Sequence, residues 1–482
     1  MYNYLVQSIH HTEPKVPRKE DRMNIAVLNG SPKGETSVTM QYVRYISKEF
    51  PQHRFTEFPV AQRINTLEKD MKAFNAIIQA VREADCVIWA FPLYFLLVPS
   101  QYKRFIELVF ERGAHQAFKG KPAAVITTSI HFFDHTAHTY MRAICEDLGM
   151  RRVGAYSASM YDLLRSVERR RFREFAAIIL EEAVRRPSLT LSVPPRRPKR
   201  AVRYRPGPPK SKVIAKGKRV LILADAPESS SNIAEMSRRL FDAFEDHPRF
   251  FLLQDIDVKG GCLGCIQCGW NNECVYGDTD AHRAFYEEEI KKADIIFFCA
   301  GIRDRYFSAR WKQFLDRSFY NNHTPVLRGK QIAFIISGPF SECDALREFV
   351  TCFPEFQMGN LAGLVTDEIG TPKEIDARID ELARRAVDLS ERGYIAPPTF
   401  PTVGGWKIFR DEIDSWLRFP FAADHRYYRS HGLYDFPRRF SRRRIVSGLM
   451  LLLSRIPSVR NEIYKRRLKD EMIKPFKSVL KN

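Results

Sequence analysis

Short runs of apolar residues alternate along this chain with longer amphipathic segments, and this alternation limits the fold more than any other feature of the sequence. In the first half, runs such as Asn24–Leu28 and Cys86–Phe91 are each followed by a turn and then by a segment with helical periodicity. Short apolar strands connected by helices form parallel sheets with helices on both faces. The pattern therefore predicts an α/β fold with a doubly wound parallel sheet.

The same order of elements occurs twice. In the first half the expected strands span residues 24–28, 86–91, 123–127 and 153–157, and the expected helices span 37–50, 100–111, 136–148 and 168–185. In the second half the expected strands are 219–223, 250–254, 295–299, 332–336 and 361–365, with helices at 232–244, up to 292, and at 308–320, 341–352 and 373–390. We interpret the chain as two diverged copies of one five-stranded unit.

The length of 482 residues agrees with this interpretation, because a single core stops growing at roughly 250 residues. The predicted segments are an N-terminal arm (1–22), a first α/β domain (23–186), a basic proline-rich linker (187–217), a second α/β domain (218–395) and a basic, aromatic, mostly helical extension (396–482). The stretch Pro194–Arg219 contains six prolines and no acidic residue. Such a composition favours an extended, solvated linker.

The net charge of +20 is expected to attract acidic partners, which include nucleic acid, anionic membranes, phosphate-bearing cofactors and acidic electron carriers. Much of this charge lies in the linker and the C-terminal extension. Four of the nine cysteines crowd between Cys262 and Cys274, which is not the distribution of a disulfide framework. We find no secretory signal and no apolar run of roughly 18 residues that would span a membrane. The sequence predicts a cytoplasmic protein.

The turn after the first expected strand, Asn29–Thr39, has the sequence NGSPKGETSVT. Its glycines allow a tight turn, Ser31 and Ser37 offer hydroxyl groups, and Lys33 adds a positive charge. The helix that follows directs its free N–H groups and the positive end of its dipole into this turn. The combination suits a phosphate monoester, although it is neither a Walker motif nor a spaced-glycine dinucleotide fingerprint.

A second loop follows the strand that ends near Phe91. Loops at the carboxyl ends of parallel strands, beside the point where strand order reverses, commonly bind ligands. Pro92 stiffens this loop, and Tyr94 and Phe95 provide flat apolar surface on which a ring system can stack. Pro99 is suited to the start of the next helix.

Gly-Ser-Pro-Lys in the first loop and Pro-Leu-Tyr in the second, followed by Lys103 and an acidic residue four positions later, resemble the NADPH-dependent FMN reductase and iron–sulfur flavoprotein superfamily. The resemblance covers roughly Met23–Ser157 and implies a flavodoxin-like fold that binds FMN. The residues that it implies as FMN contacts are Ser31, Lys33 and Ser37 for the phosphate, Pro92, Leu93, Tyr94 and Phe95 for the ring, and Thr128 and Ser129 in a third loop. That third loop departs from the family, which often has a glycine-rich turn there. The alternative is a flavodoxin-like domain that has lost its flavin.

The segment Gly260–Asp280 contains four cysteines, Cys262, Cys265, Cys268 and Cys274. Three thiolates two residues apart can converge from one tight loop, and a fourth from the same segment completes a ligand set for a 4Fe-4S cluster. Structural zinc sites usually combine two separated Cys-x2-Cys pairs instead. This spacing, after the second strand of its unit, resembles the motif of the iron–sulfur flavoproteins, which implies that these four residues are the metal ligands. The alternative is a cysteine-rich remnant without a metal.

The second domain departs from the family in both of its own flavin loops. Glu228 stands in its first loop, where it would repel a phosphate, and Arg303 stands where Tyr94 stands in the first copy. Lys312 and Asp316 remain in register with Lys103 and Glu107. We therefore expect FMN in the first domain and the cluster in the second. In the family the cluster of one protomer faces the flavin of another, a pairing that a tandem chain can make internally or across a dimer.

The C-terminal extension is aromatic and basic. Trp406, Phe409, Ile413, Trp416 and Leu417 lie at helical spacing, which favours a helix docked on a core. The apolar run from residue 445 to 453, flanked by basic residues, is compatible with peripheral contact to an anionic membrane or with a dimer contact. Packing against protein is the preferred interpretation.

These features predict an oxidoreductase that transfers electrons between FMN and a 4Fe-4S cluster, with NAD(P)H as an additional candidate substrate. Its electron donor or acceptor would be of the ferredoxin, NAD(P)H or quinone type, and the protein would form a homo-oligomer without binding nucleic acid. No general acid or base emerges from the sequence, so the chemistry would reside in the cofactors. Two alternatives stay open: an NAD(P)H-dependent FMN or quinone reductase with structural cysteines, and a non-catalytic adaptor that binds nucleic acid or membrane.

Overall fold

The computed structural model describes residues 22–185, 191–194, 203–209, 211–226, 228–415 and 417–434, and further on residues 445, 449–450, 452–453 and 455–462. The predicted N-terminal arm lies outside this part except for Arg22, and so do much of the linker and of the 445–453 run. The chain divides into two compact units, residues 1–427 and 428–482. The first unit contains both predicted α/β domains. No helix in the described ranges is long and apolar enough to cross a membrane.

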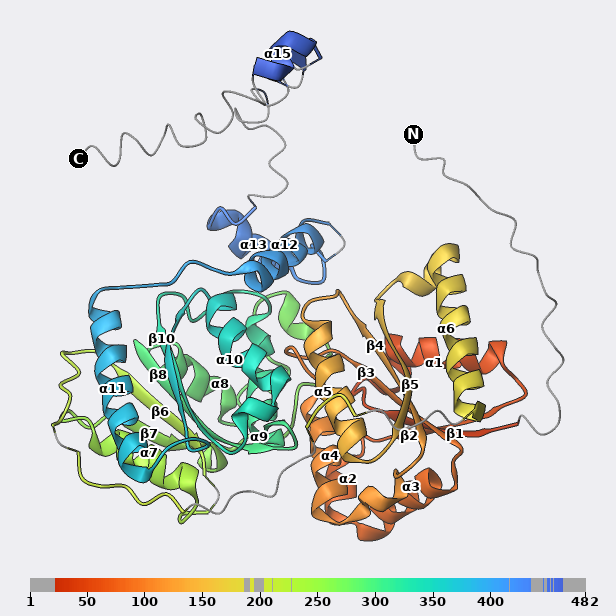
Figure 1. Cartoon of the computed structure of the whole chain (residues 1–482), viewed down its shortest axis with the longest axis horizontal. Helices are drawn as coiled ribbons and strands as arrows, with labels where there is room; N and C mark the ends of the chain where they lie inside the picture. Colours follow the sequence, from red (N-terminus) through yellow and green to blue (C-terminus); the bar gives the residue numbers. More distant parts are fainter. Residues whose placement is uncertain are drawn as a thin grey trace. The chain divides into compact units, whose positions relative to one another are not determined.

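The first domain is a parallel five-stranded sheet with the strand order β2-β1-β3-β4-β5 (Figure 1). Its strands are β1 (Asn24–Asn29), β2 (Arg54–Pro59), β3 (Cys86–Pro92), β4 (Pro122–Ser129) and β5 (Arg151–Ser159). Its helices are α1 (Val38–Glu49), α2 (Ile64–Lys69), α3 (Met71–Glu83), α4 (Ser100–Glu111), α5 (Asp134–Asp147) and α6 (Ser166–Arg185). Alternate residues of β3 lie on opposite faces of the sheet. Ile88 belongs to the same core cluster as Phe172 of α6, whereas Trp89 packs against Tyr102 of α4 with 5.8 Å between ring centroids.

The second domain repeats this arrangement with the order β7-β6-β8-β10-β11. Its strands are β6 (Val220–Asp225), β7 (Arg249–Leu252), β8 (Ile295–Arg303), β9 (Tyr306–Phe307), β10 (Gln331–Ser337) and β11 (Asn360–Thr366). Its helices are α7 (Asn232–Asp242), α8 (His282–Phe285), α9 (Ala309–Arg317), α10 (Asp344–Phe356) and α11 (Pro372–Glu391). The doubly wound flavodoxin-like fold is confirmed in both domains. The expected count of five strands is wrong for the second, because β9 folds back antiparallel on the end of β8.

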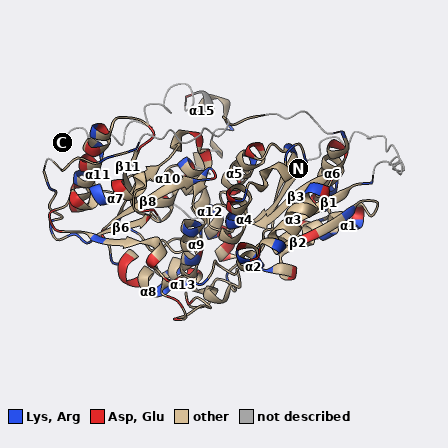
Figure 2. Cartoon of the chain, turned by 90° about the horizontal axis from the view of Figure 1, so that it is seen from below, with Lys and Arg blue, Asp and Glu red and all other residues tan. Residues whose placement is uncertain are grey.

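Both sheets are buried on two faces, and the distribution of charge follows from this. Strands β3 and β6 are buried along nearly their whole length. Figure 2 shows the charged residues mainly on helices and connecting segments, while the strands are largely free of them. Burial on both faces explains why these strands read as continuous apolar runs in the sequence.

Two features differ from the sequence-based expectations. The sequence pattern does not predict strand β2, because RFTEFP has no apolar run. This strand lies at the sheet edge, and none of its residues is buried. The stretch predicted to be a solvated linker is in part docked on the second domain. Tyr204 is buried in the core of that domain and its hydroxyl donates to Asp376, while the Gly207 N–H donates to the same carboxylate at 2.9 Å. An aromatic side chain such as Tyr204 can anchor a proline-rich stretch to a domain, although the composition of the stretch alone predicts a solvated linker.

The C-terminal extension contains α12 (Phe400–Asp414) and α13 (Ala422–Ser430), and further on α15 (Pro457–Glu462). As predicted, Trp406, Phe409 and Ile413 of α12 are buried. Trp406 stacks on Phe356 of α10 at 5.0 Å between ring centroids. The predicted fourth member of this stripe, Trp416, lies outside the described residues. Helix α12 is therefore packed on the second domain.

The two domains meet through α4 and α9, and their contacts are reciprocal. The Lys103 ammonium, which pairs with Glu107 at 3.1 Å, donates to the carbonyl of Arg303 in the other domain at 3.0 Å. In the same way Lys312, which pairs with Asp316, donates to the carbonyl of Tyr94 at 2.9 Å. All four charged side chains are at most 5% exposed.

Each carboxylate of these pairs also binds the start of the other domain's helix. Asp316 Oδ2 accepts the backbone N–H of Ser100 at 2.7 Å, and Glu107 Oε1 accepts that of Ala309 at 2.6 Å. A carboxylate at a helix N-terminus satisfies an otherwise unpaired N–H and complements the helix dipole. Although burial alone would raise it, the pKa of Glu107 lies below its usual value because Lys103 and the Ala309 N–H stabilise the carboxylate.

We expect Asp316→Asn to destabilise the protein strongly, because it leaves the buried Lys312 ammonium without its carboxylate. Loss of one partner of a buried ion pair costs about 3–5 kcal/mol in the free energy of unfolding. Urea denaturation of the full chain measures this change. The matched control is Asp388→Asn, which removes an exposed carboxylate paired with Arg384 and should cost about 1 kcal/mol or less. Equal changes in the free energy of unfolding for the two variants would contradict the stabilising role of the buried Lys312–Asp316 pair.

Candidate functional site

The turn after β1 folds back onto the end of β3. The Gly30 N–H donates to the carbonyl of Ala90 at 2.7 Å, and the Ser31 N–H donates to Asn29 Oδ1 at 2.8 Å. A side chain at position 30 would place its Cβ 2.5 Å from the ring of Tyr102. Glycine is therefore required for this close approach. Ser31, predicted as a phosphate contact, is fully buried in the turn.

Two hydroxyl groups at predicted flavin contacts are buried without a hydrogen-bond partner. Ser37 precedes α1 as its N-cap residue, yet its side chain does not cap the helix, and its Oγ is unpartnered. The hydroxyl of Tyr94 is likewise buried and unpartnered, and burial raises its pKa well above the usual value, so it keeps its proton. Buried polar groups are nearly always hydrogen-bonded in proteins. The two orphaned hydroxyls fit the polar contacts that a bound FMN would supply.

The second loop turns sharply after β3 and reaches the other domain. Tyr94 and Leu97 exchange backbone hydrogen bonds, and Phe95 and Leu96 adopt φ values of 39° and 66°, which are uncommon for residues with a side chain. Phe95 packs on Phe353 of α10, with 5.8 Å between ring centroids. Its predicted contact with the flavin ring stays a prediction, as do those of Pro92 and Leu93, which lie at the end of β3 and directly after it.

The third loop is held by its own hydrogen bonds and by the C-terminal extension. Thr128 Oγ1 lies 2.6 Å from Thr39 Oγ1, and Ser129 Oγ accepts the N–H of His131 at 2.9 Å. Phe132 packs against Phe409 of α12 at 4.3 Å between ring centroids. The hydroxyls of Thr128 and Ser129 are thus engaged within the protein, and the loop is fixed by a segment far away in the sequence.

The cysteine-bearing loop of the second domain lies on the flavin loops of the first. The Gln101 amide donates to the carbonyl of Cys262 at 3.1 Å. Gly264 contacts Tyr94 and Lys33 so closely that a Cβ there would overlap the Tyr94 hydroxyl and lie 2.7 Å from Lys33 Cε. The cysteine-bearing loop and the flavin loops are therefore in contact within one chain. Burial beneath this loop lowers the pKa of Lys33, although nearby Cys262 and Cys265 oppose the shift.

The cysteines of this loop differ in exposure, and Cys262 and Cys274 are both partly buried. Cys262 is partly buried and accepts the Gly264 N–H at 3.4 Å, whereas Cys265 is exposed. Cys268 is buried, and its thiol lies 3.4 Å from Asn322 Oδ1 and 3.8 Å from the carbonyl of Phe319. Burial raises the pKa of Cys262 and of Cys268 above the usual value of a thiol, to about 12.

The predicted convergence of Cys262, Cys265, Cys268 and Cys274 on one metal is not found. Within the described ranges no group of three or more His, Cys, Asp or Glu side chains is placed to hold a metal ion. The contacts of the two ends differ: the Cys268 thiol lies against Asn322 of the second domain, whereas the carbonyl of Cys262 accepts a hydrogen bond from Gln101 of the first. The thiols have the chemistry of a cluster ligand set, but their arrangement in this structure does not fit one.

Two residues that the sequence does not predict, Asn322 and Pro420, contact the cysteine-bearing loop. The Asn322 amide donates to the carbonyl of Cys268 at 2.9 Å, and the carbonyl of Pro420 lies against Gly269. Next to Asn322, His323 Nδ1 lies 2.6 Å from Asp424 Oδ2. Asn322 is 54 positions from Cys268 in the chain, and His323 is 101 positions from Asp424. A local sequence pattern therefore does not indicate either contact.

The predicted flavin residues line neither of two cavities in the described part of the chain. One, of about 360 Å³, lies among α2, α4, α9 and the first residues of the cysteine-bearing loop. The other, of about 440 Å³, lies beside β7 and α7 and includes Arg238, Phe241 and Phe250. At the flavin loops themselves, the cysteine-bearing loop occupies the space beside Tyr94 and Lys33.

Comparison with known proteins finds one family model that matches the first domain. Residues 23–162 match the family model described as NADPH-dependent FMN reductase. The first domain resembles these reductases. The match contains all three predicted flavin loops and ends before the second domain. No curated protein sequence matches the chain.

Solved structures similar to the chain each correspond to about one third of it. The flavoenzyme NAD(P)H:(acceptor) oxidoreductase FerB from Paracoccus denitrificans is 17% identical, over 34% of this chain and 98% of its own, with a TM-score of 0.27. An FMN-dependent NADH-azoreductase from Bacillus anthracis in complex with FMN is 14% identical, over 34% and 98%, with a TM-score of 0.27. The general stress protein 14 of Treponema denticola in complex with FMN is 13% identical, over 34% and 99%, with a TM-score of 0.26.

We expect Gly264→Ala to release the cysteine-bearing loop from the first domain, because the added methyl group overlaps the Tyr94 hydroxyl. Gly277→Ala is a matched control: it lies in the same loop and also at positive φ, but nothing lies within 4 Å of its Cβ position. The rate at which a thiol reagent modifies Cys262 reports the release. It should rise by about ten-fold in Gly264→Ala, which corresponds to about 1.4 kcal/mol of lost docking, and much less in Gly277→Ala. Equal rates in the two variants would refute this contact.

Proposed function

We propose that this protein is an NAD(P)H-dependent flavin oxidoreductase whose FMN binds in the first domain. One observation carries the proposal: Ser37 and Tyr94, in two loops of a segment that matches the FMN reductase family, have buried hydroxyls without partners. The turn that contains Ser31 and Ser37 also ends at the start of α1, where backbone N–H groups and the helix dipole favour a phosphate. When bound, FMN would supply the hydride and electron transfer chemistry.

The protein's own residues would position the cofactor. Ser31, Lys33 and Ser37 are proposed to hold the phosphate, and Pro92, Leu93, Tyr94 and Phe95 to flank the ring, with Thr128 and Ser129 behind it. The loop around Gly264 would shield this region from water, because it already covers Tyr94 and Lys33. Exclusion of water from a flavin site limits side reactions of the reduced cofactor. Entry of FMN would require this loop to move from its present position.

We further propose that the two domains arose by duplication of one flavodoxin-like unit. The two sheets have the same strand order, and the contacts of Lys103 and Glu107 recur with Lys312 and Asp316. The second copy would then supply the loop that completes the site of the first. A homo-oligomer, a ferredoxin or quinone partner and peripheral membrane contact through the extension remain expectations from the sequence.

A 4Fe-4S cluster on Cys262, Cys265, Cys268 and Cys274 is the second candidate for this loop. It is favoured by the spacing of the motif and by the contact of Gly264 with Tyr94 and Lys33. Binding would require the loop to rearrange, since Cys268 would have to leave Asn322. Bound to these four cysteines, a cluster would supply one-electron transfer chemistry. Without it the protein is a flavin reductase with structural cysteines.

FMN binding to the full chain tests the main proposal. We expect saturable quenching of FMN fluorescence by the wild-type protein, and a dissociation constant about ten-fold larger for Ser37→Ala, because a buried hydrogen bond to a charged phosphate is lost. Ser166→Ala, an exposed serine at the start of α6, is the control and should bind as the wild type does. Absence of FMN binding, or equal affinity in all three proteins, would exclude the proposed site.

The composition of anaerobically purified protein decides between the two candidates for the loop. A cluster predicts about four iron and four acid-labile sulfide per chain, and a broad visible absorption that a reductant bleaches. Cys262→Ala should abolish both, whereas Cys343→Ala, which changes a buried cysteine outside the motif, should retain them. Protein that binds FMN and contains no iron would leave the flavin reductase as the function.

A further inference from the structure

The cavity of about 360 Å³ lies between the two domains and is lined mainly by polar and charged side chains. Helices α2 and α4 contribute from the first domain, and the end of β6, the β8–α9 connection and α9 contribute from the second. Among its lining residues are Asp225, the last residue of β6, and Arg303, which makes the same reciprocal contact as Tyr94 of the first domain. The cavity therefore borders the carboxyl edge of the second sheet, where parallel sheets commonly bind ligands.

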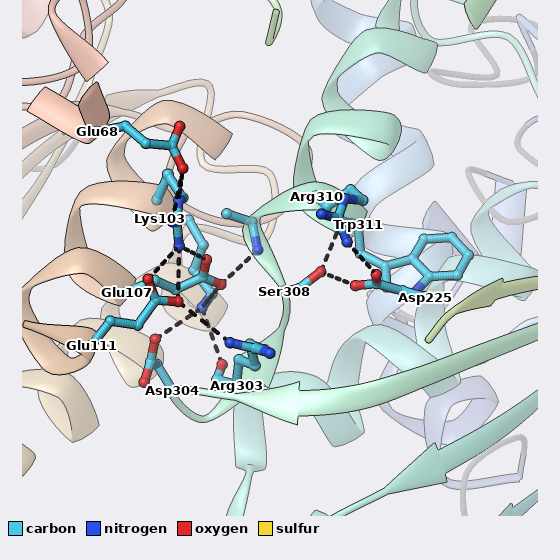
Figure 3. A network of polar contacts seen from close by, with 12 residues as sticks. Glu68, Lys103, Glu107, Glu111, Asp225, Arg303, Asp304, Ser308, Arg310 and Trp311 are labelled. Carbon is cyan, nitrogen blue, oxygen red and sulfur yellow. Dashed lines mark hydrogen bonds and ion pairs between the residues drawn. The ribbon is translucent and has the colours of Figure 1, made fainter. Parts of the chain in front are cut away.

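The carboxylates around this cavity already accept hydrogen bonds from other groups of the protein, as Figure 3 shows for most of them. Both oxygens of Glu111 accept from Arg104. Glu107 accepts from Lys103, Arg104 and the Ala309 N–H. Asp225 accepts from Ser308 through one oxygen and from Arg310 through the other. Their negative charge is thus largely balanced within the protein.

Two arginines at the cavity retain hydrogen-bonding capacity. Arg303 pairs with Glu111 through Nη1 at 3.3 Å, and Arg310 pairs with Asp225 through Nη1 at 2.8 Å. Their side chains are 46% and 45% exposed. A guanidinium has five N–H groups in a planar fork that matches carboxylate or phosphate oxygens, so each arginine has donors left for a ligand. The remaining N–H groups of these two side chains are all hydrogen-bond donors on a positively charged group.

We propose that this cavity is a second ligand site, specific for a small molecule that carries an oxyanion, and that Arg303 and Arg310 bind its phosphate or carboxylate group. The volume is at the lower end of that of small-molecule sites, which suits a ligand up to the size of a mononucleotide. Gly260 and Gly261 also line the cavity, and they lead directly into Cys262. A bound anion would therefore contact the base of the loop that covers the flavin loops. This site is independent of the proposed FMN site and does not rest on it.

Isothermal titration of the full chain without added FMN tests the proposal with three probes: inorganic phosphate, adenosine monophosphate and succinate. We expect at least one probe to bind with a stoichiometry near one. Its dissociation constant should increase by about ten-fold or more in Arg310→Gln and in Arg303→Gln, and less in Arg303→Lys, which keeps the charge but loses the planar fork. Whether phosphate compounds or succinate bind identifies the oxyanion.

Arg384→Gln is the matched control, since Arg384 is 54% exposed and pairs with acidic residues on α11, away from the cavity. This variant should bind the probe as the wild type does. Three outcomes would overturn the proposal: no probe binds, all the arginine variants lose affinity equally, or affinity is lost in Ser37→Ala instead of in Arg310→Gln. The last result would place the anion in the phosphate turn of the first domain. Retention of FMN by the arginine variants separates failure of this site from failure of the proposed function.

Discussion

Two buried lysine–carboxylate pairs at the joint between α4 and α9 determine how the rest of this structure is arranged. A buried charge is tolerated only when it is paired and hydrogen-bonded. Here each pair, Lys103–Glu107 and Lys312–Asp316, is completed by backbone groups of the other domain. Separation of the domains would leave these groups without partners. The joint therefore fixes one domain against the other, and with it the loop around Gly264 against Tyr94.

The proposed flavin site depends on this joint, because no single domain contains all of it. The first domain provides the phosphate turn and the unpartnered hydroxyls of Ser37 and Tyr94. The second domain provides the covering loop, and α12 supports the third flavin loop through Phe409. Because three regions contribute to the proposed site and are held together by packing, substitutions far from the cofactor are expected to change its binding. An ionic interface with no chemistry of its own would in this way support the proposed flavin site.

Much of the fold was predictable from the sequence, because buried parallel strands and amphipathic helices have distinct local periodicities. Helix α4 was expected at residues 100–111 and is found there. Strand β2 was missed because an exposed edge strand has no apolar run. The register of Lys103 with Lys312 was visible, but their cross-domain contacts were not, since a sequence does not show which surfaces meet. For the same reason the spacing of the cysteines indicated that they can converge, whereas Asn322 and Pro420, distant in the chain, decide where they lie.

Joining two related domains in one chain has a consequence for how such a protein can diverge. In a symmetric dimer of identical subunits, every substitution occurs at both equivalent positions of the interface. Here the position of Tyr94 in one half is held by Arg303 in the other, although both carbonyls accept a lysine in the same way. Under the proposed duplication, the covalent connection would allow one of two equivalent positions to change its chemistry while the other keeps its residue type. The backbone contacts that hold the halves together tolerate this, because they do not depend on the side chain at that position.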